Sequence, residues 1–152
     1  MNLKEMSGLE ILQAIIDRKL PPPSMAETMS LKLEKVEKGY AEFSATAGEM
    51  HLNPAGTVHG GFAATALDSV TGCAIHSMLG PGDIYGTVDL NVKMIKAIPI
   101  GVKLKAESKV IQVSSRLGTS YGSLMDENGS TYAHATATCL VTRSKPVAFS
   151  RD

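Results

Sequence analysis

The sequence predicts an α+β fold in which a six-stranded antiparallel sheet wraps around one long central helix, with a short N-terminal helix before it. Two observations lead to this prediction. Six segments have strand character, several of them alternating apolar and polar residues with a period near two. One stretch, residues 60–79, has no proline, is rich in alanine and suits a helix of about five turns. A sheet buries one face most simply against a single helix, so this stretch is expected to fill the sheet.

The segment "SGLEILQAIIDRKLPPP" is predicted to form a helix over residues 7–19. Ser7 and Glu10 have the spacing of a capping box, in which each residue bonds the backbone N–H of the other. Three prolines at 21–23 end the helix firmly. The apolar residues recur at helical spacing, namely Leu9, Leu12, Ile15 and Ile16.

A hairpin is expected next, with strands over about 28–37 and 40–48 and a tight turn at Lys38-Gly39. A loop over residues 53–58 leads into the long helix, which "GPGD" ends.

The remaining chain is expected to form four strands, within "IYGTVDLNVKMIKA", "GVKLKAESKVIQV" and "GTSYGSLMDENGSTYAHATATCLVTR". Asn128-Gly129 in the last of these segments is typical of a hairpin with a type I′ turn. The C-terminal residues after these strands are expected to be loose.

The composition predicts a single domain located in the cytoplasm. A chain of 152 residues can bury a real core as a single domain. Its fifteen basic and fifteen acidic residues cancel, which argues against binding to nucleic acid or to a membrane surface. No apolar run approaches the ~20 residues that span a bilayer, and the N-terminus does not have the pattern of a signal peptide.

Cysteine and histidine spacing predicts neither a metal site nor a disulfide. Cys73 and Cys139 lie far apart in apolar surroundings and are expected to be buried free thiols, the alternatives being a disulfide or a catalytic cysteine. The sequence has no CxxC and no HExxH, and its four histidines lack the close spacing of metal ligands.

The start of the long helix, "HGG" at 59–61, is suited to hold an oxyanion or a polarised carbonyl. A helix N-terminus presents unpaired N–H groups and a partial positive charge, and glycine lets a ligand approach the backbone closely. The alternative is that Gly60 and Gly61 serve a tight helix entry alone. No phosphate-binding motif of the GxxxxGK[ST] or GxGxxG type is present.

Asp68 is the second candidate for a functional residue. Aspartate is a poor residue for a helix interior and is rarely buried without a partner. It is either exposed on the helix edge or held in a partly desolvated site as a general base or nucleophile. Its neighbours in the sequence are apolar, namely Ala66, Leu67, Val70 and Ala74.

The spacing of these two candidates predicts a dimer. Gly60 and Asp68 are separated by about 12 Å along the helix axis, so one small reacting group cannot touch both in the same chain. If both act, they come from two antiparallel helices across a two-fold axis, and a homodimer carries two composite sites.

The stretch "NPAGTVHGGFAATALDSVTG" and the order of elements resemble the hotdog-fold thioesterases, in particular the phenylacetic-acid-degradation (PaaI) type of acyl-CoA thioesterase. The pattern N-x2-G-x2-HGG-x6-D carries the resemblance, together with the later "GTVDLNVKMIKA". The resemblance covers residues 24–142 and implies a single hotdog thioesterase domain over 24–145. Residues 1–23 are then a helical extension, to which it gives no role, and 146–152 are a tail.

The resemblance implies a role for each matching residue. The Gly60 N–H would polarise the thioester carbonyl, while Asn53 and His59 would position the carbonyl or the water. Asp68 of the opposite subunit would act as base or nucleophile, and Thr87 would hold the attacking water. The implied substrate-binding residues are Gly61 at the helix start and, as candidates for the phosphates of CoA, Lys93 and Arg116.

The implied activity is hydrolysis of an acyl-CoA to CoA and a carboxylic acid, with no cofactor because CoA belongs to the substrate. The implied assembly is a homodimer or a dimer of dimers, that is, a homotetramer. Two alternatives remain open: a hydratase or dehydratase acting on acyl-thioesters, and a non-catalytic acyl-CoA-binding protein. The low content of aromatic residues favours an acyl pocket lined by aliphatic and methionine side chains. Such a pocket suits medium-chain and arylacetyl groups alike.

Overall fold

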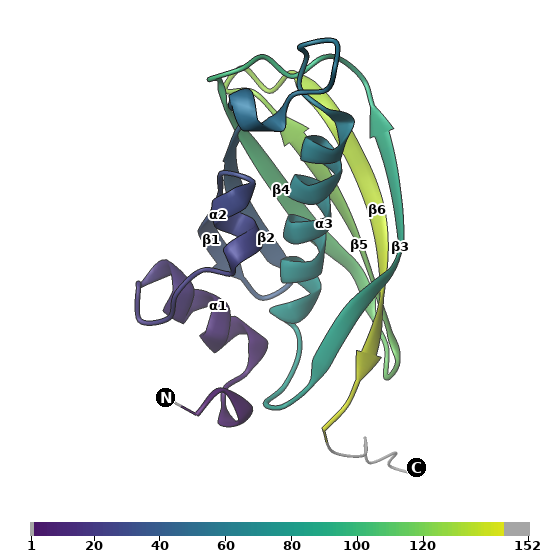
Figure 1. Cartoon of the computed structure of the whole chain (residues 1–152). Coiled ribbons are helices and arrows are strands. Elements are labelled where there is room, and N and C mark those ends of the chain that lie inside the picture. The colour runs from purple at the N-terminus through teal and green to yellow at the C-terminus, as the bar shows by residue number, and fades with distance from the viewer. Residues whose placement is uncertain (1, 145–152) are drawn as a thin grey trace.

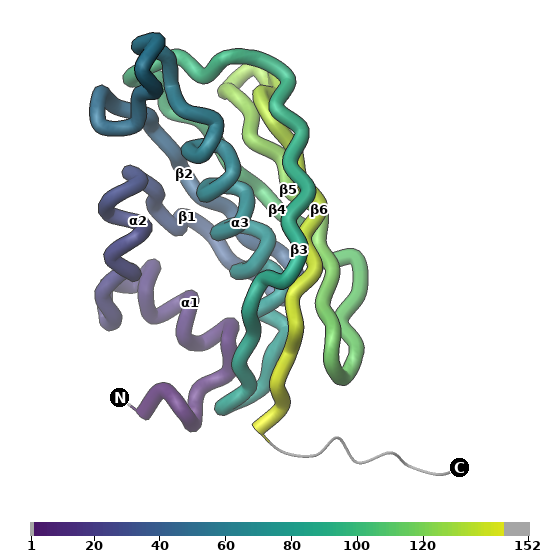
Figure 2. The backbone as a smooth tube through the Cα atoms, turned by 45° about the vertical axis from the view of Figure 1, so that its right-hand side comes forward, coloured from purple at the N-terminus to yellow at the C-terminus, as the bar shows by residue number. Residues whose placement is uncertain are grey.

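The computed structural model describes residues 2–144 and confirms the predicted sheet around one long helix (Figure 1). The strands lie in the order β1-β2-β4-β5-β6-β3, and every neighbouring pair is antiparallel. The tube view shows the sheet curving around the central helix α3, with the N-terminal helices beside β1 (Figure 2). The helices are α1 (Gly8–Ile16), α2 (Ser24–Thr28) and α3 (Gly60–His76), with short 3-10 turns at Leu3–Glu5 and Glu49–His51. The strands are β1 (Leu31–Glu37), β2 (Tyr40–Thr46), β3 (Ile84–Met94), β4 (Lys103–Val113), β5 (Leu117–Met125) and β6 (Thr131–Thr142).

Close packing between α3 and β5 holds the helix inside the sheet. A Cβ atom at Gly118 would lie 2.7 Å from the Ile75 side chain, and one at Gly122 would lie 3.0 Å from the Thr71 side chain. Any other residue at Gly118 would therefore push the helix away from the sheet. The helix residues that face the sheet are small or apolar and buried, among them Ala63, Ala66, Leu67, Val70 and Ala74.

The long helix ends three residues earlier than predicted. The expectation was residues 60–79, whereas α3 ends at His76. Ser77 follows as the C-cap, where its hydroxyl donates to the Ala74 carbonyl at 2.6 Å and accepts the Gly39 N–H at 2.8 Å. This serine therefore ties the end of the helix to the β1–β2 turn.

The N-terminal segment differs from the prediction in two places. The capping box of Ser7 and Glu10 is present, but the helix ends at Ile16 rather than near residue 19. Arg18 adopts a left-handed conformation with φ of 59°, which stops the helix ahead of the prolines. The short helix α2 was not predicted, and strand β1 begins at Leu31 rather than near residue 28.

The β5–β6 connection is a hairpin turn, but not of type I′. A type I′ turn needs positive φ at both central residues, and only Gly129 has it, at 79°. Instead, the Gly129 N–H bonds the Asp126 carbonyl at 3.0 Å, and the Asp126 carboxylate accepts the N–H groups of Asn128 and Ser130. The aspartate side chain therefore organises a longer turn.

Two further observations concern the described residues. Both cysteines are free thiols there; Cys139 is buried as expected, whereas Cys73 is only partly buried. No helix between residues 2 and 144 has the length and apolar character needed to cross a membrane. The predicted tail, 146–152, lies outside the described residues.

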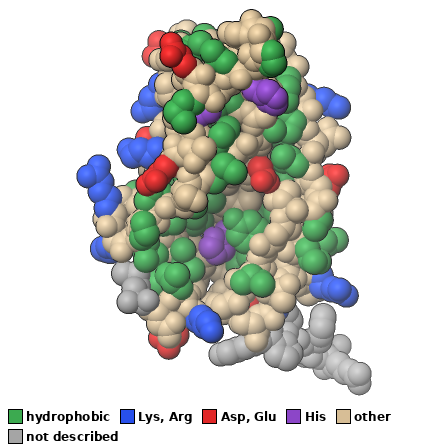
Figure 3. All heavy atoms as spheres, viewed as in Figure 1, with side chains coloured by type: hydrophobic (Ala, Val, Ile, Leu, Met, Phe, Trp, Pro, Cys, Tyr) green, Lys and Arg blue, Asp and Glu red, His purple; other side chains and the backbone are tan. Residues whose placement is uncertain are grey.

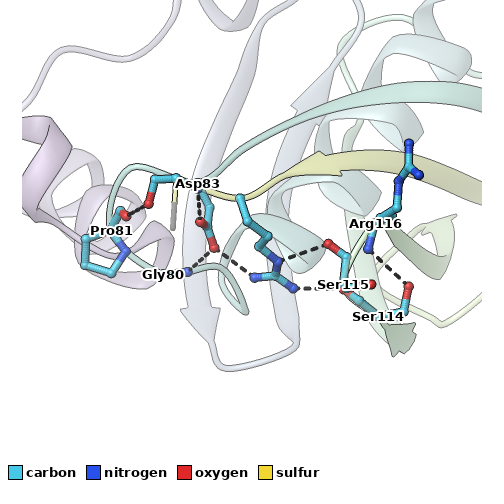
Figure 4. A network of polar contacts seen from close by, with 8 residues as sticks. Gly80, Pro81, Asp83, Ser114, Ser115 and Arg116 are labelled. Atoms are coloured by element: carbon cyan, nitrogen blue, oxygen red, sulfur yellow. Dashed lines mark hydrogen bonds and ion pairs between the residues drawn. The ribbon is translucent and has the colours of Figure 1, made fainter. Parts of the chain in front are cut away.

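The start of β3 and the end of β6 are joined by an ion pair with little solvent exposure (Figure 4). Arg143 Nη1 lies 2.8 Å from Asp83 Oδ2, and the two side chains are 24% and 8% exposed. The backbone N–H groups of Gly80 and Ser144 also donate to the Asp83 carboxylate, at 3.1 and 2.9 Å. Burial alone would raise the pKa of Asp83, but these donors outweigh it and hold the pKa below its ordinary value.

The same arginine reaches the β4–β5 turn. Its Nη2 and Nε donate to the carbonyls of Ser114 and Ser115, at 2.8 and 3.3 Å. One guanidinium thus connects three segments that are far apart in the sequence.

We expect Arg143→Met to lower the free energy of unfolding by about 3 kcal/mol, because it leaves a buried carboxylate without its counter-charge. Urea denaturation would measure the loss. The matched control is Lys35→Met, which breaks the exposed Lys35–Glu37 pair and should cost less than about 1 kcal/mol. Equal losses in the two variants would contradict this role for Arg143. Since the Asp83 pKa is lowered on folding, its contribution should be present above pH of about 4 and disappear as the pH falls through the folded-state pKa.

Candidate active site

The start of α3 leaves one backbone donor unused. His59 is the N-cap, and its Nδ1 accepts the Gly61 N–H at 2.8 Å. The Gly60 N–H takes part in no hydrogen bond within residues 2–144. It lies at the positive end of the helix dipole and is therefore available to a ligand oxygen.

The loop before the helix is held by its own side chains. Asn53 Oδ1 accepts the N–H groups of Ala55 and Thr57, at 3.0 and 3.2 Å, and its Nδ2 donates to the Thr57 hydroxyl at 2.9 Å. The His59 N–H donates to the His51 carbonyl at 2.7 Å. Asn53 thus shapes the loop that presents Gly60, and its amide is engaged within that loop.

A small cavity of about 320 Å³ lies beside Gly60. Its walls come from the helix start, the end of β3 and the start of β6, including His59, Met94 and Tyr132. A Cβ atom at Gly60 would lie 2.7 Å from the Met94 sulfur, so glycine keeps the backbone close to this strand.

Asp68 lies in a different and larger cavity, of about 690 Å³, between α3 and the N-terminal helices. Its Oδ1 is buried and has no hydrogen-bond partner. An unpaired buried carboxylate oxygen is costly and is typical of a functional site. Thr87 and Ser69 line the same cavity, so the structure brings Asp68 and Thr87 together.

The wall next to Asp68 carries two groups that stay protonated at neutral pH. Burial first, and the Asp68 charge second, raise the pKa of Cys73 to about 12. Burial also raises the pKa of Tyr85 well above its ordinary value. The Tyr85 ring packs against Gly72, where a Cβ atom would lie 3.0 Å away. Asp68 therefore faces neutral neighbours on this side.

Within one chain, Gly60 and Asp68 do not meet. The two residues line separate cavities, as the helical rise of about 12 Å between them requires. One chain presents a donor at one place and a carboxylate at another.

The two candidates for CoA phosphates lie apart from each other. Lys93 is exposed on β3, beside Met94, and strand alternation points the two side chains to opposite faces. Arg116 lies in the β4–β5 turn, next to Gly118, which packs on Ile75 in the last turn of α3. Arg116 is therefore at the opposite end of the helix from Gly60, and in Figure 4 its guanidinium points away from the Arg143 network.

Sequence reasoning gave no role to the N-terminal extension, yet this extension forms one side of the Asp68 cavity. Hydrophobic side chains gather on the face of the molecule that carries α1, α2 and α3 (Figure 3). Leu12, Ile15 and Ile16 of α1 line the cavity, together with Met25 and Ala26 around α2. The wide apolar face of α1 could have indicated this role, because an apolar helix face packs against the rest of the protein.

No group of three or more His, Cys, Asp or Glu side chains within residues 2–144 is arranged to hold a metal ion.

The sheet around α3 is a hotdog fold of the kind found in thioesterases. The chain belongs to the thioesterase superfamily, whose family model matches residues 55–143. No curated protein matches the chain significantly.

Solved structures of the same fold include proteins of phenylacetic acid degradation. A phenylacetic acid degradation-related protein from Ralstonia eutropha JMP134 is 27% identical, with a TM-score of 0.77 over 85% of this chain and 98% of that one. The E. coli PaaI protein from the phenylacetic acid degradation operon is 16% identical, with a TM-score of 0.76 over 88% and 95% of the two chains. Zebra fish thioesterase superfamily member 2 is 23% identical, with a TM-score of 0.71 over 89% and 98%. The last two likenesses concern the fold alone.

The raised pKa of Cys73 predicts slow alkylation. At pH 8 the thiol should react with iodoacetamide at least about 10²-fold more slowly than a free cysteine, since only the thiolate reacts. Asp68→Asn removes a neighbouring negative charge, so it should lower the Cys73 pKa and speed the reaction. Mass spectrometry of the labelled peptide would measure both rates. Identical rates in the two proteins would mean that Asp68 carries no charge near this thiol.

Proposed function

We propose that the protein hydrolyses an acyl-CoA thioester to CoA and a carboxylic acid. The observation that carries the proposal is the buried, unpaired Oδ1 of Asp68, facing a cavity large enough for an acyl group. The unused Gly60 N–H supports it, because thioester hydrolysis needs a donor for the oxyanion as well as a base.

In the proposed reaction Asp68 acts as general base. A water molecule held by the Thr87 hydroxyl gives a proton to the Asp68 carboxylate while its oxygen bonds to the carbonyl carbon. The Gly60 N–H stabilises the negative charge that forms on the carbonyl oxygen. When the intermediate collapses, the C–S bond breaks, and the thiolate of CoA takes the proton from Asp68. In the alternative route an Asp68 oxygen itself attacks the carbonyl carbon, and the C–S bond breaks to release CoA as a thiolate. Water then hydrolyses the resulting anhydride, which regenerates Asp68 and supplies the proton that the thiolate takes up.

The proposal requires two subunits, with Gly60 from one and Asp68 from the other. The open edge of the sheet supports a dimer. Strand β3 has a neighbour on one side only, and its Ile84 and Val88 side chains are 63% and 62% exposed. A long exposed edge strand invites pairing with another chain. Pairing of β3 with its symmetry copy would set two α3 helices antiparallel across the interface.

The other site residues take supporting roles in this proposal. Asn53 holds the loop that presents Gly60. His59 and Gly61 fix the helix start through their mutual hydrogen bond, which leaves the other side of the imidazole for the substrate. Lys93 and Arg116 are the proposed contacts for the phosphates of CoA, and an antiparallel dimer brings the Arg116 end of one helix toward the Gly60 end of the other.

Asp68→Asn is expected to lower kcat by at least about 10²-fold, the scale of a lost general base, while the protein stays folded. Thiol release from an acyl-CoA panel would measure kcat, and circular dichroism would check folding. The matched control is Glu127→Gln, which removes an exposed carboxylate that lines neither cavity and should keep activity within a few-fold. Wild-type turnover by Asp68→Asn would rule out the proposed base.

The composite site can be tested by mixing two inactive variants. Gly60→Pro deletes the N–H and Asp68→Ala deletes the carboxylate, so each should be inactive alone. Co-refolding would produce mixed dimers with one doubly defective site and one intact site. Activity should return to about one quarter of the wild-type value, because random pairing makes half of the dimers mixed.

This experiment needs two controls. Circular dichroism must show that Gly60→Pro folds, and differently tagged chains must show that the subunits exchange. If mixed dimers form without any recovered activity, Gly60 and Asp68 of different subunits do not combine in one site, and the cross-subunit arrangement is wrong.

A further inference from the structure

The Asp68 cavity has a polar end and a long apolar remainder. Asp68, Ser69 and Thr87 lie at one part of its wall. Arg18 and Lys32 are exposed residues at its rim. The remaining wall is mainly aliphatic, with Leu12, Ile15 and Ile16 on the side of α1 and Leu31, Leu33 and Phe43 on the side of the sheet.

The size of the cavity distinguishes between acyl groups. A single aromatic ring fills a closed apolar cavity of about 150 Å³, whereas this cavity measures about 690 Å³ in one chain and is partly open to its surroundings. An arylacetyl group would therefore leave most of the apolar wall uncovered. A flexible aliphatic chain can follow the wall and cover more of it, and each further buried methylene adds to its affinity.

We propose that the cavity binds an aliphatic acyl chain of medium length, and that Ile15 and Ile16 of α1 limit how long this chain can be. The inference rests on the proposed hydrolysis, which sets the thioester beside Asp68. From there the chain extends between α1 and the sheet, and the two isoleucines are wall residues on the last turn of α1.

The other end of α1 is fixed, so its last turn has a defined position relative to Asp68. The Gly8 N–H donates to the Leu79 carbonyl at 3.0 Å. A Cβ atom at Gly8 would lie 1.8 Å from the His76 carbonyl oxygen, so the start of α1 packs directly on the end of α3. A helix held in this way can act as a fixed wall and set a length limit.

The first measurement is the dependence of kcat/KM on chain length, by thiol release from butyryl-, hexanoyl-, octanoyl-, decanoyl- and dodecanoyl-CoA. We expect kcat/KM to rise about fourfold for each added methylene until the cavity is full, and then to level off. Phenylacetyl-CoA should react at least about tenfold less efficiently than decanoyl-CoA. A flat profile, or a preference for phenylacetyl-CoA, would overturn the inference.

The second measurement compares three variants on the same helix. Ile15→Phe should fill part of the cavity and lower the kcat/KM ratio of dodecanoyl- to hexanoyl-CoA by at least about tenfold. Ile15→Ala should move the limit to longer chains. Ile11→Phe is the control, because Ile11 is partly buried on α1 but does not line the cavity, and it should leave the profile unchanged. If Ile15→Phe and Ile11→Phe behave alike, Ile15 does not set the limit.

A binding measurement separates this inference from the proposed reaction. Isothermal titration calorimetry with decanoate needs no turnover, and binding should weaken in Ile15→Phe but not in Ile11→Phe. Suppose that decanoate binding weakens in Ile15→Phe but not in Ile11→Phe, and that no acyl-CoA releases thiol. The assignment of the acyl cavity is then supported, and the proposed hydrolysis is wrong. If thiol is released but neither variant changes decanoate binding or the chain-length profile, the hydrolysis stands and the inference is wrong.

Discussion

The contact between α3 and the glycines of β5 is the constraint on which the rest of the structure depends. Because Gly118 and Gly122 have no side chains, the sheet lies directly against Ile75 and Thr71 and wraps the helix on that side. The helix face that the sheet does not cover carries Asp68 and its neighbours. The face of α3 that packs on β5 thus determines which way the Asp68 face points, and the N-terminal helices pack over the Asp68 face.

Most of the fold was predictable from local patterns. The Ala-rich stretch, the strand segments and the capping box at Ser7 each determine their own element. What the patterns did not predict depends on backbone states that several residue types can adopt. Arg18 takes a positive φ that is uncommon outside glycine, and Asp126 replaces the expected turn by accepting two N–H groups with its side chain.

The candidate site residues Gly60 and Asp68 were predictable from the sequence, but the cavity around Asp68 was not. The unpaired Gly60 N–H and the odd position of Asp68 in an apolar helix follow from the rules for helix ends and buried charge. The cavity is made by segments far apart in the chain, such as Ile15 and Thr87. No spacing rule joins them, because their proximity arises only when α1 docks on α3.

The three prolines between α1 and α2 have a consequence for the ligand. Pro23 has φ of −63° and ψ of 145°, an extended conformation close to what its ring imposes in the unfolded chain as well. A linker with so few accessible conformations loses little backbone entropy when it becomes ordered. Packing of the helices on either side of these prolines therefore costs little backbone entropy at residues 21–23. A ligand that bound in the cavity would then lose little affinity to the ordering of this part of its wall.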